Sequence, residues 1–346
     1  MDFSIFSILM LDGITNGAVY GLLGLATVLV FTVTRVIFIA QGEFVAYGAL
    51  TLAVFQTGKV PGTVWLLLIA AILAAVMEFT NRFQQGENIK SALTASVRLL
   101  IFPFLISLLS LWAAPLHLPL AVQSILTVAI VSAFGPLLYR IAYQSLESES
   151  SLVLLIVSVG VHFGMSGLGL LFFGAEGYRN PSFWDLNLVL GPVNLNGQTI
   201  IIFCTALTLI VMLWLFFERT LYGKALRATA VNRNGARLMG ISTHTSGQLT
   251  FTMAAMIGSI SGLLIGPSTT VFYDSGFLIG LKGFVAAVIA GLASYPIAMI
   301  GALGVGIVES FGSFWTSAFK EVIVFTLVLP VLLWLSLKNR HLDGEN

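Results

Sequence analysis

Long apolar stretches separated by short polar segments dominate the chain. Eleven of them approach or exceed the length of about 20 apolar residues that a helix needs to cross a bilayer. They are residues 7–34, 43–57, 62–80, 98–116, 119–141, 151–173, 198–217, 246–270, 277–293, 296–315 and 319–337. The pattern predicts an all-α fold, a polytopic transmembrane helical bundle of about 9–11 spans.

Two of these stretches, 43–57 and 277–293, are short for a full span. Gly280, Gly283 and Gly291 also interrupt the second one. Short or glycine-broken segments in polytopic proteins often form half-helices beside a cavity. We therefore expect both segments to line a translocation pathway.

The composition excludes an ordinary soluble protein. Charged residues make up 9% of the chain and hydrophobic residues 58%, whereas soluble domains carry about 25% charged residues. The net charge is +1, and the sequence has no basic stripe of the kind that nucleic-acid-binding proteins carry. The single cysteine, Cys204, lies in an apolar run, so it is interpreted as a packing residue and the chain has no internal disulfide.

The basic residues predict an orientation. With a cytoplasmic C-terminus, twelve Lys and Arg residues fall on the cytoplasmic side and four fall outside or within the membrane, as the positive-inside rule requires. The loop 174–197 then lies outside. The loop 218–245 lies inside and holds five of the twelve: Arg219, Lys224, Arg227, Arg233 and Arg237. An odd number of spans would place the N-terminus outside.

Glycines at a spacing of four predict close helix packing. They are Gly13, Gly17 and Gly21, then Gly160 and Gly164, then Gly258, Gly262 and Gly266. Small residues at this spacing share one helix face and let two backbones approach. No polar linker divides the chain, so residues 1–346 are interpreted as a single transmembrane domain.

Motifs for catalysis are absent. Neither Gly-Lys pair, at Lys59 and Lys224, continues into a phosphate-binding loop. The four histidines are scattered, without the spacing of a metal site. No Gly-x-Ser-x-Gly motif occurs. The sequence therefore indicates a transport protein that is not an enzyme and binds no cofactor or metal itself.

Gln41, Gly42 and Glu43 form the first polar site, between an apolar run and the short segment 43–57. Gly42 permits a sharp turn, and a carboxylate in the first turn of a helix interacts favourably with its dipole. Two interpretations remain open. The site either presents Gln41 and Glu43 to a translocation cavity, or Glu43 only stabilises a helix start at the interface.

Lys282 forms the second polar site, inside an apolar segment. An ammonium at membrane depth costs about 2.5–3.5 kcal/mol on insertion scales. It must therefore face a polar cavity, pair with a carboxylate, for which Asp274 and Glu43 are candidates, or extend to the interface. His162, in 151–173, is either part of the pathway or a hydrogen-bonded core residue.

The inside loop forms the third polar site. Arg233 and Arg237 are spaced by four and share a helix face, and Gly240 suits the C-terminal cap of a short helix. A short amphipathic helix between spans suggests a docking element for a cytoplasmic partner. The alternative is a solvated basic loop.

These segments together resemble the permeases of branched-chain amino acid ABC importers, of the LivH type. The resemblance begins at Asn16-Gly17-Ala18-Val19-Tyr20-Gly21-Leu22 and runs through Gln41-Gly42-Glu43. It resumes at Gly223 to Ile241, continues through Gly280-Leu281-Lys282-Gly283-Phe284 and Gly291 to Pro296, and ends with Gly301 to Glu309. It covers most of 1–57 and 119–337.

The resemblance implies a permease in a bacterial inner (plasma) membrane. Its implied partners are a LivM-like second permease, two cytoplasmic ATPases that bind the ATP, and a periplasmic or extracellular solute-binding protein. The resemblance also implies a coupling helix, here within Ala228 to Gly240. Together with the polar sites above, we assign the substrate path to Gln41, Gly42, Glu43, His162, Lys282 and Phe284, and ATPase coupling to Arg227, Ala230, Asn232, Arg233, Arg237 and Gly240.

The chain departs from the family pattern in three places. Residues 58–118 look like an inserted helical pair. Pro296-Ile297 stands where the family usually has Pro-Gly, and an acidic residue usual near Val231-Asn232 is replaced. Related importers carry urea, short amides or aromatic acids, so these remain alternative solutes. An autonomous secondary transporter and a non-transporting scaffold are the competing functions.

Overall fold

The computed structural model describes residues 3–190, 193–326, 330 and 333, and within them nearly all regular structure is helical. The helices are α1 (Phe3–Thr34), α2 (Glu43–Gln56), α3 (Gly62–Gln84), α4 (Ile89–Ala113), α5 (Leu120–Leu138), α6 (Ser151–Phe173), α7 (Gly197–Arg219), α8 (Leu221–Val231), α9 (Arg233–Leu238), α10 (Thr243–Ile265), α11 (Ser275–Ile289) and α12 (Tyr295–Trp315). Short turns are η1 (Ile39–Gly42), η2 (Ala114–Leu116), the π-helical η3 (Tyr139–Tyr143), η4 (Gln144–Leu146) and η5 (Ser317–Phe319).

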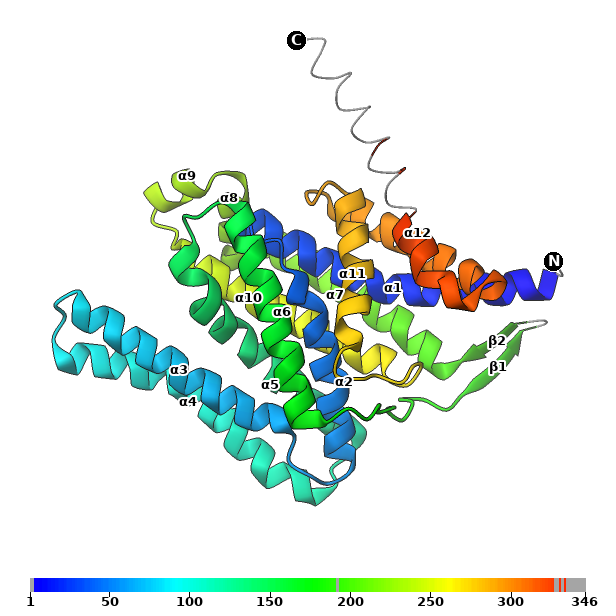
Figure 1. The fold of residues 1–346 in the computed structure, drawn as a ribbon, viewed down its shortest axis with the longest axis horizontal. Coiled ribbons are helices and arrows are strands. Elements are labelled where there is room, and N and C mark those ends of the chain that lie inside the picture. Colours follow the sequence, from blue (N-terminus) through cyan, green and yellow to red (C-terminus); the bar gives the residue numbers. More distant parts are fainter. Residues whose placement is uncertain (1–2, 191–192, 327–329, 331–332, 334–346) are drawn as a thin grey trace, which may run out of the picture.

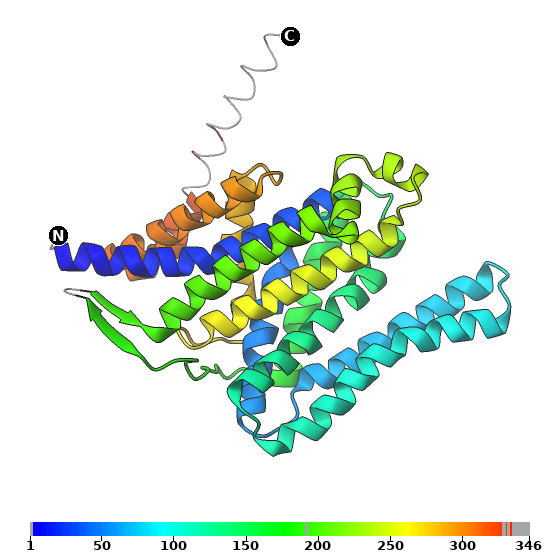
Figure 2. The same ribbon diagram turned by 180° about the vertical axis from the view of Figure 1, so that it is seen from behind.

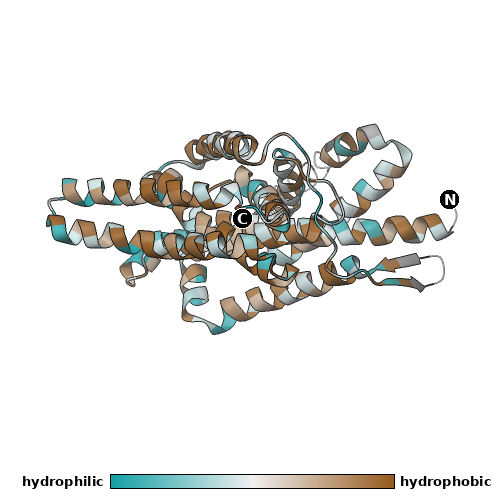
Figure 3. Cartoon of the chain, turned by 90° about the horizontal axis from the view of Figure 1, so that it is seen from below, coloured by the Kyte–Doolittle hydropathy of each residue, from teal (hydrophilic) through white to brown (hydrophobic). Residues whose placement is uncertain are grey.

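Eight helices of the described residues have the length and composition to cross a membrane. The polytopic helical bundle expected from the sequence is therefore confirmed. Hydrophobic residues predominate along the helices (Figure 3). Of the last expected span, 319–337, residues 319–326 are continuously described: Phe319 ends η5 and 320–326 are helical. Lys338, Arg340 and the C-terminus lie outside the described residues.

Helix α1 is the central element of the bundle. From Gly17 to Val30 it is buried all round, and it packs against α12, α10, α11 and α7. A helix that is apolar on every side is stable only when other helices or lipid surround it. Figure 1 shows α1 running from the β hairpin at one end of the bundle to α8 at the other.

Two of the three glycine series pack helices closely. A Cβ on Gly17 would lie 2.8 Å from Leu303 Cα of α12, and one on Gly258 would lie 2.6 Å from Phe44 Cβ of α2. The third series differs, because a Cβ added to Gly160 or Gly164 of α6 would meet no described atom of a neighbouring element within 4 Å. The packing prediction therefore holds for α1 and α10 and is wrong for α6 within this chain.

The chain breaks its helical path after α1. Arg35 has a left-handed backbone with φ of 61°, and η1 then leads into α2. Helix α11 is also short, at 15 residues or about 22 Å. The glycines do not interrupt it, contrary to expectation: α11 is continuous through Gly280 and Gly283 and ends before Gly291, whose φ is 62°.

The segment 58–118 forms a helical hairpin, α3 and α4, that extends away from the other helices (Figures 1 and 2). It packs on α5 through small residues such as Ala71 and Ala74. Its outer face is apolar and exposed, with Ile69, Ile72 and Phe102 each at least 56% exposed. Such a face suits contact with lipid.

The loop 174–197 contains a hairpin that the sequence analysis did not anticipate. Strands β1 (Asn187–Leu190) and β2 (Val193–Asn196) pair antiparallel, with Asn187 opposite Asn196. Helix α7 starts directly after β2 and ends directly before α8. The hairpin and the α8–α9 region therefore lie at opposite ends of a 23-residue helix.

Substitution of Gly17 by Val is expected to destabilise the bundle, because the new side chain would meet the α12 backbone. Overpacking of this kind costs about 1–3 kcal/mol. The matched control is Gly160→Val, which makes the same change on a helix face open to the surroundings. In thermal unfolding in detergent, the midpoint temperature should fall clearly for Gly17→Val and not for Gly160→Val. Equal losses would contradict the close packing of α1 on α12.

Candidate functional site

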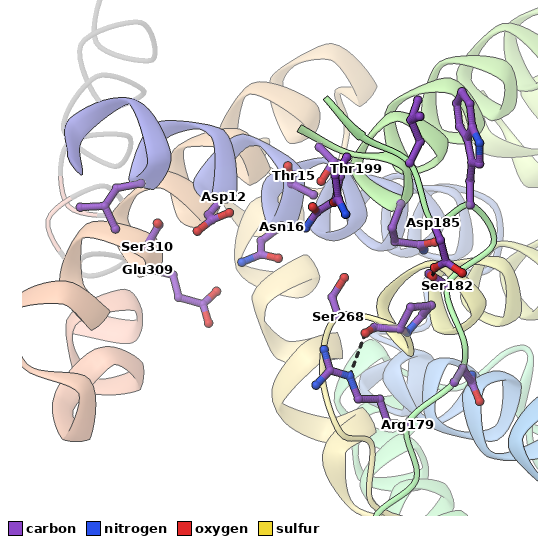
Figure 4. A pocket seen from close by; sticks show the side chains of 18 of the residues that line it. Asp12, Thr15, Asn16, Arg179, Ser182, Asp185, Thr199, Ser268, Glu309 and Ser310 are labelled. Carbon is purple, nitrogen blue, oxygen red and sulfur yellow. Dashed lines mark hydrogen bonds between the residues drawn. The ribbon is translucent and has the colours of Figure 1, made fainter. Parts of the chain in front are cut away.

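A polar cavity of about 750 Å³ opens at the end of the bundle that carries the β hairpin. It lies between α1, the 179–187 segment, β2, α7, the loop after α10, and α12 (Figure 4). Its lining residues are mostly polar: Asp12, Thr15, Asn16, Arg179, Asn180, Ser182, Asp185, Asn187, Asn196, Gln198, Thr199, Ser268, Glu309, Ser310, Ser313 and Lys320, with Leu9, Trp184, Leu186 and Pro267.

Hydrogen bonds hold the 179–187 segment against the membrane helices. Arg179 Nε donates to the Pro267 carbonyl at 2.9 Å (Figure 4), and the Asn180 amide donates to the Ala49 carbonyl at 3.1 Å. Gln198 Nε2 donates to the Leu264 carbonyl at 2.9 Å. The acceptors are carbonyls at or just after the C-terminal end of α10 (Leu264 and Pro267) and in the middle of α2 (Ala49), so the wall of the cavity is fixed to both helices.

The cavity offers charges of both signs. Asp12, Asp185 and Glu309 supply carboxylates, and Arg179 and Lys320 supply cations. Carboxylates bind an ammonium group, and a guanidinium binds a carboxylate through charge-assisted hydrogen bonds. The lining therefore suits a small zwitterionic or polar solute, and the volume lies within the range of small-molecule sites.

Lys282 of α11 lies beneath this cavity in a buried ionic network. Its Nζ donates to Glu309 Oε1 at 2.6 Å and to Glu321 Oε1 at 3.1 Å, and Tyr20 OH donates to Glu309 Oε2 at 2.7 Å. Lys282 is 4% exposed and Glu309 7%. Of the three interpretations of Lys282, pairing with a carboxylate is correct. The expected partners, Asp274 and Glu43, are wrong.

Glu43 and His162 form a second buried pair. His162 Nδ1 of α6 lies 2.8 Å from Glu43 Oε1, and Glu43 is fully buried at the start of α2. The His162 ring also packs on Phe277, with 4.7 Å between ring centroids. The other carboxylate oxygen, Oε2, has no hydrogen-bond partner among the described residues. Glu43 therefore does more than start a helix, because it ties α2 to α6.

Gln41 and Gly42 lie at a close helix crossing. Gln41 Nε2 donates to the Ala254 carbonyl of α10 at 2.9 Å. Gly42 contacts Gly276 of α11, and a Cβ on Gly276 would lie 2.6 Å from the Gly42 carbonyl oxygen. None of the six expected substrate-path residues (Gln41, Gly42, Glu43, His162, Lys282 and Phe284) lines the cavity directly. Lys282 reaches it through Glu309, and a role for the others in transport stays a prediction.

The loop 218–245 folds as two short helices rather than one. Asn232 separates them, and its Oδ1 accepts a hydrogen bond from the Gly235 amide at 2.9 Å to cap α9. Gly240 follows α9 with φ of 80°, as expected for a helix C-cap. Leu238 and Met239 are 89% and 82% exposed. The loop thus presents an apolar tip.

The two arginines of α9 bind within the chain. Arg233 NH2 and Arg237 NH2 donate to the same oxygen of Glu147 at 2.6 and 3.0 Å. Arg227 forms an exposed pair with Glu218 at 3.0 Å. Ala230 and Asn232 complete the expected set at the end of α8 and the junction with α9. The contacts indicate that Arg233 and Arg237 position the loop.

The sequence analysis missed several functional candidates. Asp12 is the one charged residue of the first apolar stretch, and an isolated intramembrane carboxylate was a usable signal. Lys320 and Glu321 open the last stretch and were assigned no role. The approach of Glu321 to Lys282 and of Arg179 to the α1 end depends on tertiary packing, so no sequence spacing could reveal it.

Comparison with protein families identifies one match. Residues 90–336 match the family described as "Branched-chain amino acid transport system / permease component". This match covers most of the chain, from α4 to beyond α12.

Individual proteins similar to this chain are also described as branched-chain amino acid permeases. The high-affinity branched-chain amino acid transport system permease protein BraD of Pseudomonas aeruginosa is 31% identical over 237 residues, 66% of this chain and 76% of BraD. The corresponding protein LivH of Escherichia coli K12 is 26% identical over 340 residues, 94% of this chain and 92% of LivH. Among solved structures, PsaBC from Streptococcus pneumoniae in complex with Fab aligns over 97% of this chain and 94% of the PsaBC chain. The sequence identity is 13% and the TM-score is 0.39, so the family assignment does not use this alignment. The chain therefore belongs to the family of branched-chain amino acid transport permeases.

Proposed function

We propose that this chain is a membrane-spanning permease subunit of an ABC importer and forms part of the path for a branched-chain amino acid. The family match over residues 90–336 carries the proposal. The family resemblance also implies that separate ATPase subunits bind and hydrolyse the ATP, and the chain itself lacks a phosphate-binding loop.

The polar cavity supports solute entry at the β-hairpin end. A branched-chain amino acid is a zwitterion with a small apolar side chain, so it needs an anionic partner, a cationic partner and limited apolar surface. Asp12, Glu309 and Arg179 supply the charges, and Leu9 and Trp184 supply apolar surface. A solute-binding protein outside the cell would deliver the solute to this end.

The opposite end supports ATPase docking. Helices α8 and α9 carry four basic residues (Lys224, Arg227, Arg233 and Arg237) and an apolar tip at Leu238 and Met239. The positive-inside rule places this end in the cytoplasm, together with the C-terminus, and places the cavity and the N-terminus outside. We further propose a LivM-like permease as the second membrane subunit, in the bacterial inner (plasma) membrane.

The function is tested by reconstitution. The chain is placed in proteoliposomes with its ATPases, second permease and binding protein, and uptake of labelled leucine, isoleucine and valine is measured. We expect uptake of at least one of them only with hydrolysable ATP, because the ATPases supply the driving force. Uptake by the chain alone, driven by an ion gradient, would instead favour a secondary transporter.

Lys282→Ala is expected to lower uptake about tenfold or more. The change leaves Glu309 and Glu321 without their cation, and an unpaired buried carboxylate costs about 3–5 kcal/mol, more than the 1.4 kcal/mol that shifts an equilibrium tenfold. The control is Lys59→Ala, which removes an exposed lysine from the α2–α3 loop. Uptake is measured per assembled transporter, so that any loss of folded protein is separated from loss of transport. Normal uptake per assembled complex by Lys282→Ala would contradict a role of this network in transport.

Leu238→Asp with Met239→Asp should weaken ATPase binding by about thirtyfold, because exposed apolar anchors carry much of the energy of an interface. Asn234→Asp is the control, since it adds a charge to the same helix without removing an apolar side chain. Binding is measured by titrating purified ATPase onto the permease in lipid nanodiscs. Equal affinities for the two variants would exclude the apolar tip as the docking surface.

A further inference from the structure

The polar connection between α5 and α6 contains one largely buried carboxylate. Glu147 follows η4, and its side chain is 7% exposed. Glu149 lies two residues further along, is exposed, and forms no ion pair among the described residues. The two carboxylates share one loop but differ in surroundings.

Three basic side chains from the α9–α10 region converge on Glu147. Arg233 NH2 and Arg237 NH2 donate to its Oε1 at 2.6 and 3.0 Å, and His244 Nδ1 lies 2.9 Å from its Oε2. Arg233 also donates to the Glu147 main-chain carbonyl at 3.2 Å. Hydrogen bonds between charged groups are stronger than neutral ones and fix orientation as well as distance.

The two helices of the loop are attached to the bundle by different means. Helix α8 has an apolar anchor, because Leu226 is 1% exposed and packs in a cluster with Leu29 and Phe217. Helix α9 has six residues, and only Ala236 is buried. Within the described residues, its hydrogen bonds to the α5–α6 connection all end at Glu147, two at the carboxylate and one at the main-chain carbonyl.

Arg237 extends this connection to the next span. Its Nε and NH2 both lie 3.1 Å from Oγ1 of Thr243, the first residue of α10, while NH2 also binds Glu147. The carboxylate thus joins α9, the start of α10 and the α5–α6 connection at one point. Helix α5 in turn packs extensively against α10.

We infer that Glu147 is a positioning residue for energy coupling: it fastens the ATPase-facing helix α9 to the α5–α6 connection, so that a displacement of α9 moves these spans. The inference rests on the proposed function. Without the carboxylate, the apolar tip still offers Leu238 and Met239 to an ATPase, but α9 keeps only the Arg233 bond to the Glu147 main-chain carbonyl and follows α5 and α6 less closely. ATP is then hydrolysed without proportionate transport.

The test measures solute transported per ATP hydrolysed. The assembled transporter is reconstituted with Glu147→Gln, which keeps the side-chain shape and removes the charge, or with the matched control Glu149→Gln. The probe is whichever of leucine, isoleucine and valine the unaltered transporter takes up. We expect Glu147→Gln to lower the ratio about fivefold or more, the lower end of typical coupling effects, with ATPase binding retained. Glu149→Gln should leave the ratio unchanged, and Glu147→Asp should recover part of the loss.

A second measurement does not depend on the solute. Spin labels are attached at Ser145 and Asn234, both exposed, in a Cys204→Ser background. ATP binding should leave the distance between the labels unchanged in the otherwise unaltered transporter and change it with Glu147→Gln. If Glu147→Gln does not fold, Arg233→Gln with Arg237→Gln removes the same link from the other side.

The outcomes separate this inference from the proposed function. Equal transport ratios and equal label distances for Glu147→Gln and Glu149→Gln would overturn the inference. Selective loss of ATPase binding with Glu147→Gln would also overturn it, because that result assigns Glu147 to docking. Failure of the unaltered permease to bind any ATPase would contradict the proposed function itself.

Discussion

The ionic network around Lys282 is the constraint on which the core of the permease depends. A lone ammonium within the bilayer is costly, so α11 is stable in its place only with a carboxylate beside it. Glu309 of α12 supplies that carboxylate and also accepts a hydrogen bond from Tyr20 of α1. One carboxylate therefore joins three helices. Because Glu309 also lines the cavity, the same contact fixes the helix packing and shapes the cavity.

Lipid provides little hydrophobic force between helices, so close packing and polar contacts must hold them together. The glycines of α1 and α10 provide the packing, and buried polar contacts such as Glu43 with His162 provide specificity. Helix α1 spans 32 residues, about 48 Å, and reaches from the cavity to α8. One rigid element thus contacts both the cavity end of the bundle and the α8–α9 end, so a displacement at one end can reach the other.

Much of this architecture could be predicted from the sequence, for definite physical reasons. Hydrophobic length identified the spans, including the short helices α2 and α11, because the bilayer sets a fixed length. Packing partners could not be predicted: Lys282 pairs with residues 27 and 39 positions away, and the contacts of Glu147 cross 86 to 97 positions. The open glycine face of α6 was also unpredictable, because spacing identifies a helix face and does not identify its neighbour.

The proposed function requires the cavity and the α8–α9 tip to serve opposite sides of the membrane. A cryo-electron microscopy structure of the transporter assembled with its ATPases and solute-binding protein in lipid tests this most directly. We predict ATPase density on Leu238 and Met239, and binding-protein density over the β hairpin and the cavity bounded by Asp12 and Arg179. ATPases bound at the cavity end, or at a site away from α8 and α9, would contradict the account.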